Sequence, residues 1–75
     1  MQRAAVDSET IASIGYDPTR KMLEIEFRHS GEVYLYFDVP QSEYEAFMSA
    51  PSKGTYLNQQ FKKAGYRFER LGLDE

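Results

Sequence analysis

The sequence has 75 residues, no cysteine, one histidine and a formal net charge of −3. This length accommodates one domain, and the cysteine and histidine counts exclude disulfides and a structural zinc site, which needs four nitrogen or sulfur ligands. The negative charge argues against strong indiscriminate binding to nucleic-acid backbones.

The N-terminal stretch, residues 1–7, has no periodicity and is expected to be flexible. We predict a single domain over residues 8–71 and a tail over residues 72–75. Within the domain, residues 10–16 are rich in β-branched and aromatic side chains and end at the turn signal Asp17-Pro18-Thr19. This combination predicts a first strand.

Two further strands follow. Residues 21–28 alternate between apolar and charged side chains, which is the pattern of a half-buried strand. Gly31 is suited to the tight turn that comes next, because glycine adopts positive φ without strain. Residues 32–39 predict a third strand, which Pro40 ends because a proline cannot donate to a ladder.

The period then changes from two to about 3.6, which predicts helices. Ser42 to Glu45 fits a capping box, in which the serine accepts a backbone amide and the glutamate reaches back to the serine amide. This first helix is expected to end before Pro51. A second helix is expected after residues 52–54, with Gly65 just beyond its C-terminus. Residues 66–71 alternate again, as either a final strand or an extended tail.

The predicted fold class is therefore α+β, with the element order β-β-β-α-α. We expect a three-stranded antiparallel meander with two short helices packed on one face. Six tyrosines and five phenylalanines provide the apolar area that a core of this size requires.

The register of the second hairpin decides which face carries Tyr34 and Tyr36. A two-residue loop at Ser30-Gly31 pairs Phe27 with Tyr34 and Ile25 with Tyr36, which places both tyrosines on the core face. A three-residue loop with a bulge at Gly31 would instead turn both tyrosines outward. We favour the first register, because the helices must cover the face that carries the apolar residues of the second strand.

The favoured register leaves three apolar side chains on the opposite face of the sheet. We call Val33, Leu35 and Phe37 the outer patch. An exposed apolar patch of this kind suggests a protein partner or a homodimer.

Charge is distributed unevenly along the chain, because the basic residues outnumber the acidic ones only in residues 53–75. The candidate anion-binding side chains of that third are Lys53, Lys62, Lys63, Arg67 and Arg70. These five residues are the predicted nucleic-acid-binding set. Lys62 and Lys63 also have an ordinary explanation, since cations stabilise the last turn of a helix.

Five pieces of sequence, in this order, resemble the KTSC family. They are Ser13-Ile-Gly-Tyr-Asp17, Leu23-Glu-Ile-Glu-Phe27, Val33-Tyr-Leu-Tyr36, Val39-Pro40 with Tyr44 downstream, and Gly54-Thr-Tyr-Leu-Asn58. The central Tyr-x-Tyr of the family matches Tyr34 and Tyr36. The last piece supplies three further motif residues, which are Gly54, Tyr56 and Asn58.

The resemblance implies a domain found at the C-terminus of some lysyl-tRNA synthetases and in short bacterial and phage proteins. RNA binding has been suggested for the family from that attachment. This sequence departs from the family in one respect, because Gln59 and Gln60 follow Asn58 where the family often has a basic residue.

No catalytic residue, metal site or cofactor is predicted. His29 lies in a hairpin turn with only Ser30 nearby as a nucleophile, and acid–base catalysis requires a positioned partner. Glu24 and Glu26 are interpreted as a solvated strand face offset by Arg28.

The sequence thus favours a small, non-catalytic binding module that contacts RNA or single-stranded DNA weakly through residues 53–70. For Tyr34 and Tyr36, a core role is favoured over base stacking. The alternative is a homodimerising or protein-binding accessory protein of bacterial or phage type that uses the outer patch. Without a signal peptide or an apolar stretch long enough to span a membrane, a cytoplasmic location is expected.

Overall fold

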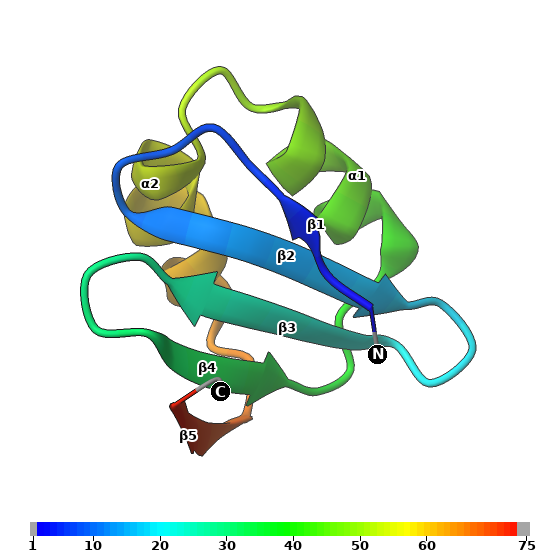
Figure 1. Cartoon of the computed structure of the whole chain (residues 1–75). Helices are drawn as coiled ribbons and strands as arrows, with labels where there is room; N and C mark the ends of the chain where they lie inside the picture. Colours follow the sequence, from blue (N-terminus) through cyan, green and yellow to red (C-terminus); the bar gives the residue numbers. More distant parts are fainter. Residues whose placement is uncertain (1, 74–75) are drawn as a thin grey trace.

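The computed structural model describes residues 2–73, which form a five-stranded antiparallel sheet with the helices on one side of it (Figure 1). The strands follow chain order across the sheet. Their bounds are Ala4–Ala5 (β1), Ile11–Asp17 (β2), Met22–Phe27 (β3), Glu32–Tyr36 (β4) and Phe68–Leu73 (β5). The helical segments are Gln41–Ser49 (α1), Lys53–Tyr56 (α2), the π-helical turn Leu57–Phe61 (η1) and the 3₁₀ turn Lys62–Ala64 (η2).

The predicted α+β class with an antiparallel sheet and two helices is confirmed, but the three-stranded meander is incomplete. β5 pairs with β4 along Phe68 to Leu73, so the C-terminal alternation forms a strand rather than an extended tail. β1 was not predicted, because two alanines carry no alternation; it exists through pairing with Ile14 and Ser13 of β2. The predicted flexibility of residues 1–7 and the predicted domain bounds stay predictions, and residues 74 and 75 of the predicted tail lie outside the described residues.

The second hairpin adopts neither of the two registers considered from the sequence. Ile25 lies opposite Tyr34 and Leu23 opposite Tyr36, so both predicted loop lengths are wrong. The connection between β3 and β4 is residues 28–31; the Gly31 amide donates to the Phe27 carbonyl (2.9 Å), and the Arg28 amide donates to the Thr10 carbonyl (2.9 Å), which ties the start of this connection to the chain before β2. The observed register differs from the favoured one by two residues, and a shift of two preserves the face. Tyr34 and Tyr36 therefore lie on the core face, as predicted.

The core lies between this face of the sheet and the helices. The sheet and the loop after it contribute Ile11, Ile14, Leu23, Ile25, Tyr36 and Val39, and the helices contribute Phe47, Leu57 and Phe61. Each of these side chains is at most 6% exposed. The apolar stripes predicted for the strands and helices thus meet in one layer.

The first helix begins differently from the prediction. Its N-cap is Pro40, with no side-chain cap, and the Pro40 carbonyl accepts the amides of Glu43 (3.0 Å) and Tyr44 (3.2 Å). The predicted capping box at Ser42 is wrong, because the chain already turns into the helix at Gln41. The end of the second helical segment agrees with the sequence, since Gly65 adopts a left-handed conformation at φ 75°.

No helix in the described part of the chain is long and apolar enough to cross a membrane.

Candidate binding site

An aromatic cluster extends from the core to the surface at the β4–β5 edge of the sheet. The Tyr34 ring stacks on Phe68, with centroids 5.3 Å apart and an interplanar angle of 12°, and meets the edge of Phe27 at 5.1 Å. The Tyr36 ring meets Phe61 edge-on at 4.8 Å. Tyr36 is 6% exposed, Tyr34 is half-buried and Phe68 is 51% exposed. The cluster therefore presents ring surface to solvent at its outer end.

Two adjoining hollows open over this cluster. The β5 hollow, about 330 Å³, is lined by Tyr34, Tyr36, Phe61, Lys62, Tyr66 and Phe68. The hairpin hollow, about 310 Å³, is lined by Thr10, Phe27, His29, Ser30, Glu32, Tyr34, Tyr36 and Lys62. Tyr34, Tyr36 and Lys62 line both hollows. We refer to the two together as the aromatic site.

The hydroxyl groups of Tyr34 and Tyr36 have no protein partner among the described residues. Neither is a buried unpaired atom, so each is accessible to solvent or to a ligand. Burial, with a smaller contribution from neighbouring Tyr34, raises the pKa of Tyr36 to about 12. The Tyr36 hydroxyl is therefore a neutral hydrogen-bond donor at physiological pH.

The charged groups of the aromatic site are arranged on two sides. Lys62 lies at the wall that the hollows share. Glu32 lines only the hairpin hollow, and its Oε2 atom forms an ion pair with Arg70 Nε at 2.9 Å. Arg70 is the cross-strand neighbour of Tyr34, so β5 places this cation beside the hairpin hollow.

The structure does not bring the five predicted basic residues together. Lys53 lies at the start of α2 and donates to the Ala50 carbonyl at 3.0 Å. Arg67 covers the Phe37 ring at 4.7 Å, and Arg70 is engaged by Glu32. Lys62 lines the aromatic site, and Lys63 is exposed beside it in the sequence. Nucleic-acid binding by the five-residue set stays a prediction.

The outer patch is less accessible than the sequence suggested. Val33 is 4% exposed, Leu35 is half-buried, and Phe37 is half-buried beneath Arg67. A role for this patch as an interface stays a prediction, with little free apolar area to support it.

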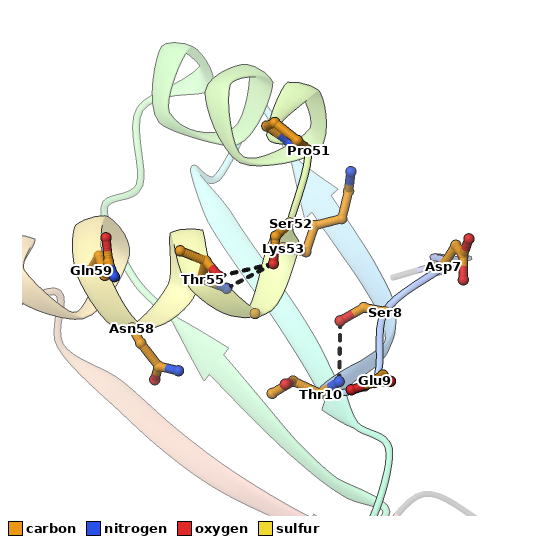
Figure 2. A pocket seen from close by; sticks show the side chains of 11 residues that line it. Asp7, Ser8, Glu9, Thr10, Pro51, Ser52, Lys53, Thr55, Asn58 and Gln59 are labelled. Atoms are coloured by element: carbon orange, nitrogen blue, oxygen red, sulfur yellow. Dashed lines mark hydrogen bonds between the residues drawn. The ribbon is translucent and has the colours of Figure 1, made fainter.

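A separate polar hollow of about 490 Å³ lies between the N-terminal segment and the second helical segment (Figure 2). Gly54 is needed for close packing here, because a Cβ atom at this position would lie 2.8 Å from Thr10 Oγ1. Ser8 Oγ accepts the amides of Thr10 and Ile11, and Ser52 Oγ accepts the amide of Thr55. The hydroxyl groups of Ser8 and Ser52 at this hollow are therefore engaged in local capping.

The motif residues Tyr56 and Asn58 have different surroundings. Tyr56 donates to Glu43 Oε2, and Tyr66 donates to Glu43 Oε1 at 2.9 Å, so one carboxylate joins α1, α2 and the approach to β5. The hydrogen bond to Glu43, then burial, raise the pKa of Tyr56 to about 12; burial, then the same carboxylate, raise the pKa of Tyr66 to about 12. Asn58 is exposed at the edge of the polar hollow (Figure 2).

Sequence reasoning missed Phe68 and Glu32 as parts of a site. The alternation of residues 66–71 gave a signal for Phe68, because a strand there would put it on the same face as Tyr66. No local signal marked Glu32, since its position depends on pairing with β5. Within residues 2–73, no three histidine, aspartate or glutamate side chains are grouped closely enough to hold a metal ion.

Comparison with known proteins gives a consistent result. The model of the KTSC domain matches residues 7–66. The chain is 42% identical over 71 residues to an uncharacterized protein of Stutzerimonas stutzeri, covering 95% of this chain and 99% of that protein. It is 44% identical to a KTSC domain protein from Yersinia pestis of known crystal structure, with a TM-score of 0.86, covering 95% of this chain and 97% of that one.

Longer proteins also match. A lysine–tRNA ligase of Nostoc sp. is 41% identical over 61 residues, which are 81% of this chain and 10% of the ligase. A lysine–tRNA ligase of Nostoc punctiforme is 42% identical over 65 residues, which are 87% of this chain and 11% of the ligase. The chain thus spans about a tenth of the length of these ligases.

Proposed function

Because this chain belongs to the KTSC domain family, we propose that it is a small, non-catalytic module that binds single-stranded RNA at the aromatic site. The observation that carries the proposal is the meeting of exposed ring surface with Lys62 over two hollows. Tyr34 and Phe68 supply the ring surface, and Tyr36 supplies a neutral donor.

Aromatic side chains bind single-stranded nucleic acid because every base has a flat π-face. Stacking of one base on an aromatic side chain contributes roughly 1–3 kcal/mol. Ligand pockets typically have volumes of roughly 300–1,000 Å³, so hollows of about 310 and 330 Å³ suit groups as small as a nucleobase. The ammonium group of Lys62, on the wall between the hollows, is placed to neutralise a phosphate.

The matching lysine–tRNA ligases favour RNA over other aromatic ligands. Their name describes enzymes that act with a tRNA, and each contains a segment similar to this chain. A domain of this kind can contribute RNA affinity without chemistry of its own.

The charge balance limits the expected affinity. The net charge is −3, and Lys53, Arg67 and Arg70 are already engaged away from the shared wall of the hollows. We therefore expect weak binding that depends on stacking first and on one or two phosphate contacts second. The dependence on salt should be shallow, because its slope scales with the number of phosphates neutralised.

The test is an NMR titration of the isotope-labelled protein with short single-stranded RNA and DNA at low and physiological salt. The expected result is shift changes at Tyr34, Tyr36, Lys62 and Phe68. Lys62→Ala should weaken binding, whereas Lys53→Ala, which removes the same charge beside the polar hollow, should leave it nearly unchanged. An absence of shifts at low salt would overturn the proposal.

The outer patch is tested with the same labelled protein in the absence of nucleic acid. If the protein self-associates, and Leu35→Asp abolishes that self-association while Lys62→Ala has no effect on it, the module is a self-associating one instead. The smaller free area of that patch makes this the second choice.

A further inference from the structure

The two hollows of the aromatic site differ in chemistry, although they share a wall. The β5 hollow is bounded on its far side by the rings of Phe61, Tyr66 and Phe68. Beyond the shared wall, the hairpin hollow is lined by one ring, that of Phe27, and by the polar side chains of Thr10, His29, Ser30 and Glu32. A ligand that occupies both therefore meets a stacking surface in one and hydrogen-bonding groups in the other.

From this asymmetry, which rests on the proposed function, we infer that the site holds two consecutive nucleotides and reads the base in the hairpin hollow. Single-stranded RNA is read by hydrogen bonds to the Watson–Crick edges of bases that are splayed out onto aromatic side chains. The β5 hollow accepts any base by stacking, and the phosphate between the two nucleotides lies at Lys62.

Glu32 sets the preference in the hairpin hollow. An ionised carboxylate can accept hydrogen bonds but cannot donate them. It therefore favours a base that presents an amino group, as cytosine presents its N4 atom. Uracil presents a carbonyl oxygen at the equivalent position, and that oxygen is repelled by a carboxylate. Cytosine is therefore preferred over uracil.

Arg70 acts as a positioning residue for this selection. Its Nε atom holds Glu32 Oε2 at 2.9 Å, which fixes the carboxylate beside the hollow. Arg70 does not line the hollow, so it acts on the base only through Glu32.

The test compares hexacytidylate with hexauridylate by fluorescence anisotropy. The wild type should bind hexacytidylate about tenfold more tightly, which is the lower part of the discrimination that one good side chain–base contact gives. Glu32→Gln should reduce the ratio to near one or reverse it, because the amide nitrogen of glutamine donates to the uracil carbonyl.

Glu69→Gln is the matched control. It makes the same change of charge on β5, but Glu69 is the cross-strand neighbour of Leu35 and lies on the outer face. It should leave the ratio unchanged. Arg70→Ala should lower the ratio less than Glu32→Gln does. Thermal unfolding of each variant establishes that it is folded.

The possible failures are distinguishable. If the wild type binds both oligomers equally, or if Glu32→Gln and Glu69→Gln change both affinities alike, base selection by Glu32 is overturned while RNA binding stands. If neither oligomer binds, the proposed function itself fails.

Discussion

The two faces of the sheet are covered in different ways. The inner face is covered by helices, which pack aromatic and aliphatic side chains such as Phe47 and Phe61 against it. The outer face is crossed by the N-terminal segment, which lies in front of the sheet in Figure 1. Its Arg3 donates to Ser13 Oγ (3.0 Å) and forms an ion pair with Glu24 (2.7 Å).

The difference shows where a ligand has room. On the outer face, Ser13 also donates to Glu26 at 2.8 Å, so the polar groups there satisfy one another. On the inner face, the helical layer ends before the β4–β5 edge, and the ring surface of Tyr34 and Phe68 remains open. The candidate site is therefore the place where the apolar inner face of the sheet extends beyond the helices that pack on it.

The largest expected effect on the inner face comes from Phe61→Ala. Phe61 is 1% exposed and touches Phe47, Tyr36 and Tyr66, so its truncation leaves a cavity. We expect a loss of about 3–5 kcal/mol in the free energy of unfolding, measured by chemical denaturation. Phe68→Ala, at a ring that is 51% exposed, should cost about 1 kcal/mol or less. Equal losses would contradict the contrast between core and open edge.

Loss of the Tyr56 hydroxyl should have the next largest effect. Tyr56→Phe removes a hydrogen bond to the Glu43 carboxylate, and hydrogen bonds to charged groups contribute about 1.5–3 kcal/mol. The folded state raises the pKa of Tyr56 to about 12 and so retains the proton more tightly than the unfolded chain. The stabilisation is therefore complete below pH 10 and is lost as the pH rises from about 10 through 12.

This pH dependence gives a direct measurement. The difference in the free energy of unfolding between the wild type and Tyr56→Phe should be constant from pH 7 to 9 and shrink above pH 10. A difference that stayed constant up to pH 12 would show that the hydroxyl does not stabilise the fold through its proton.

The outer face is tested by Gly15→Ala. A Cβ atom at Gly15 would lie 2.6 Å from the Gln2 carbonyl oxygen and 2.9 Å from Arg3 Cγ, so the N-terminal segment would have to move. Overpacking costs roughly 1–3 kcal/mol, and we expect the lower part of that range, because a chain end can move away. The Val6 amide, which donates to the Ala12 carbonyl at 3.1 Å, should exchange its hydrogen faster. Unchanged protection of Val6 would contradict this account.

The smallest effect is expected for the ion pair on the same face. Arg3→Ala should lower the free energy of unfolding by about 0.5–1 kcal/mol: the side chains of the pair are only 17% and 13% exposed, but the N-terminal segment can move and let water reach Glu24. A double-mutant cycle with Glu24→Gln isolates the pair. A coupling energy near zero would show that backbone pairing, and not this ion pair, holds the N-terminal segment against the outer face.

Much of the fold follows from local pattern. Strand composition, alternation and turn signals located β2, β3 and β4 to within a residue or two, except that β4 ends at Tyr36 rather than Val39. It ends there because Asp38 turns the chain at φ 57°. Helix periodicity and Gly65 located the helical segments. The capping box failed because a proline carbonyl accepted the first helical amides.

Features that depend on distant residues were not predictable. Glu24 and Glu26 were expected to be offset by Arg28, but Arg28 donates to the carbonyl groups of Ser8, Val6 and Ile11 instead. The partner of Glu24 is Arg3, which is 21 residues away in the sequence. Nothing in the local sequence distinguishes these two arginines.

The sequence by itself determined the fold class, the family and the face that carries Tyr34 and Tyr36. The 3.6-residue period of helices and the alternation of strand side chains between the two faces of a sheet are local properties. A register error of two residues leaves the face of each side chain unchanged. The tertiary structure alone decided the register, the separation of the basic residues, and the placement of Phe68, Glu32 and Lys62 around those tyrosines. Each of these depends on which strand or helix lies beside which, and this is set by the packing of the whole chain.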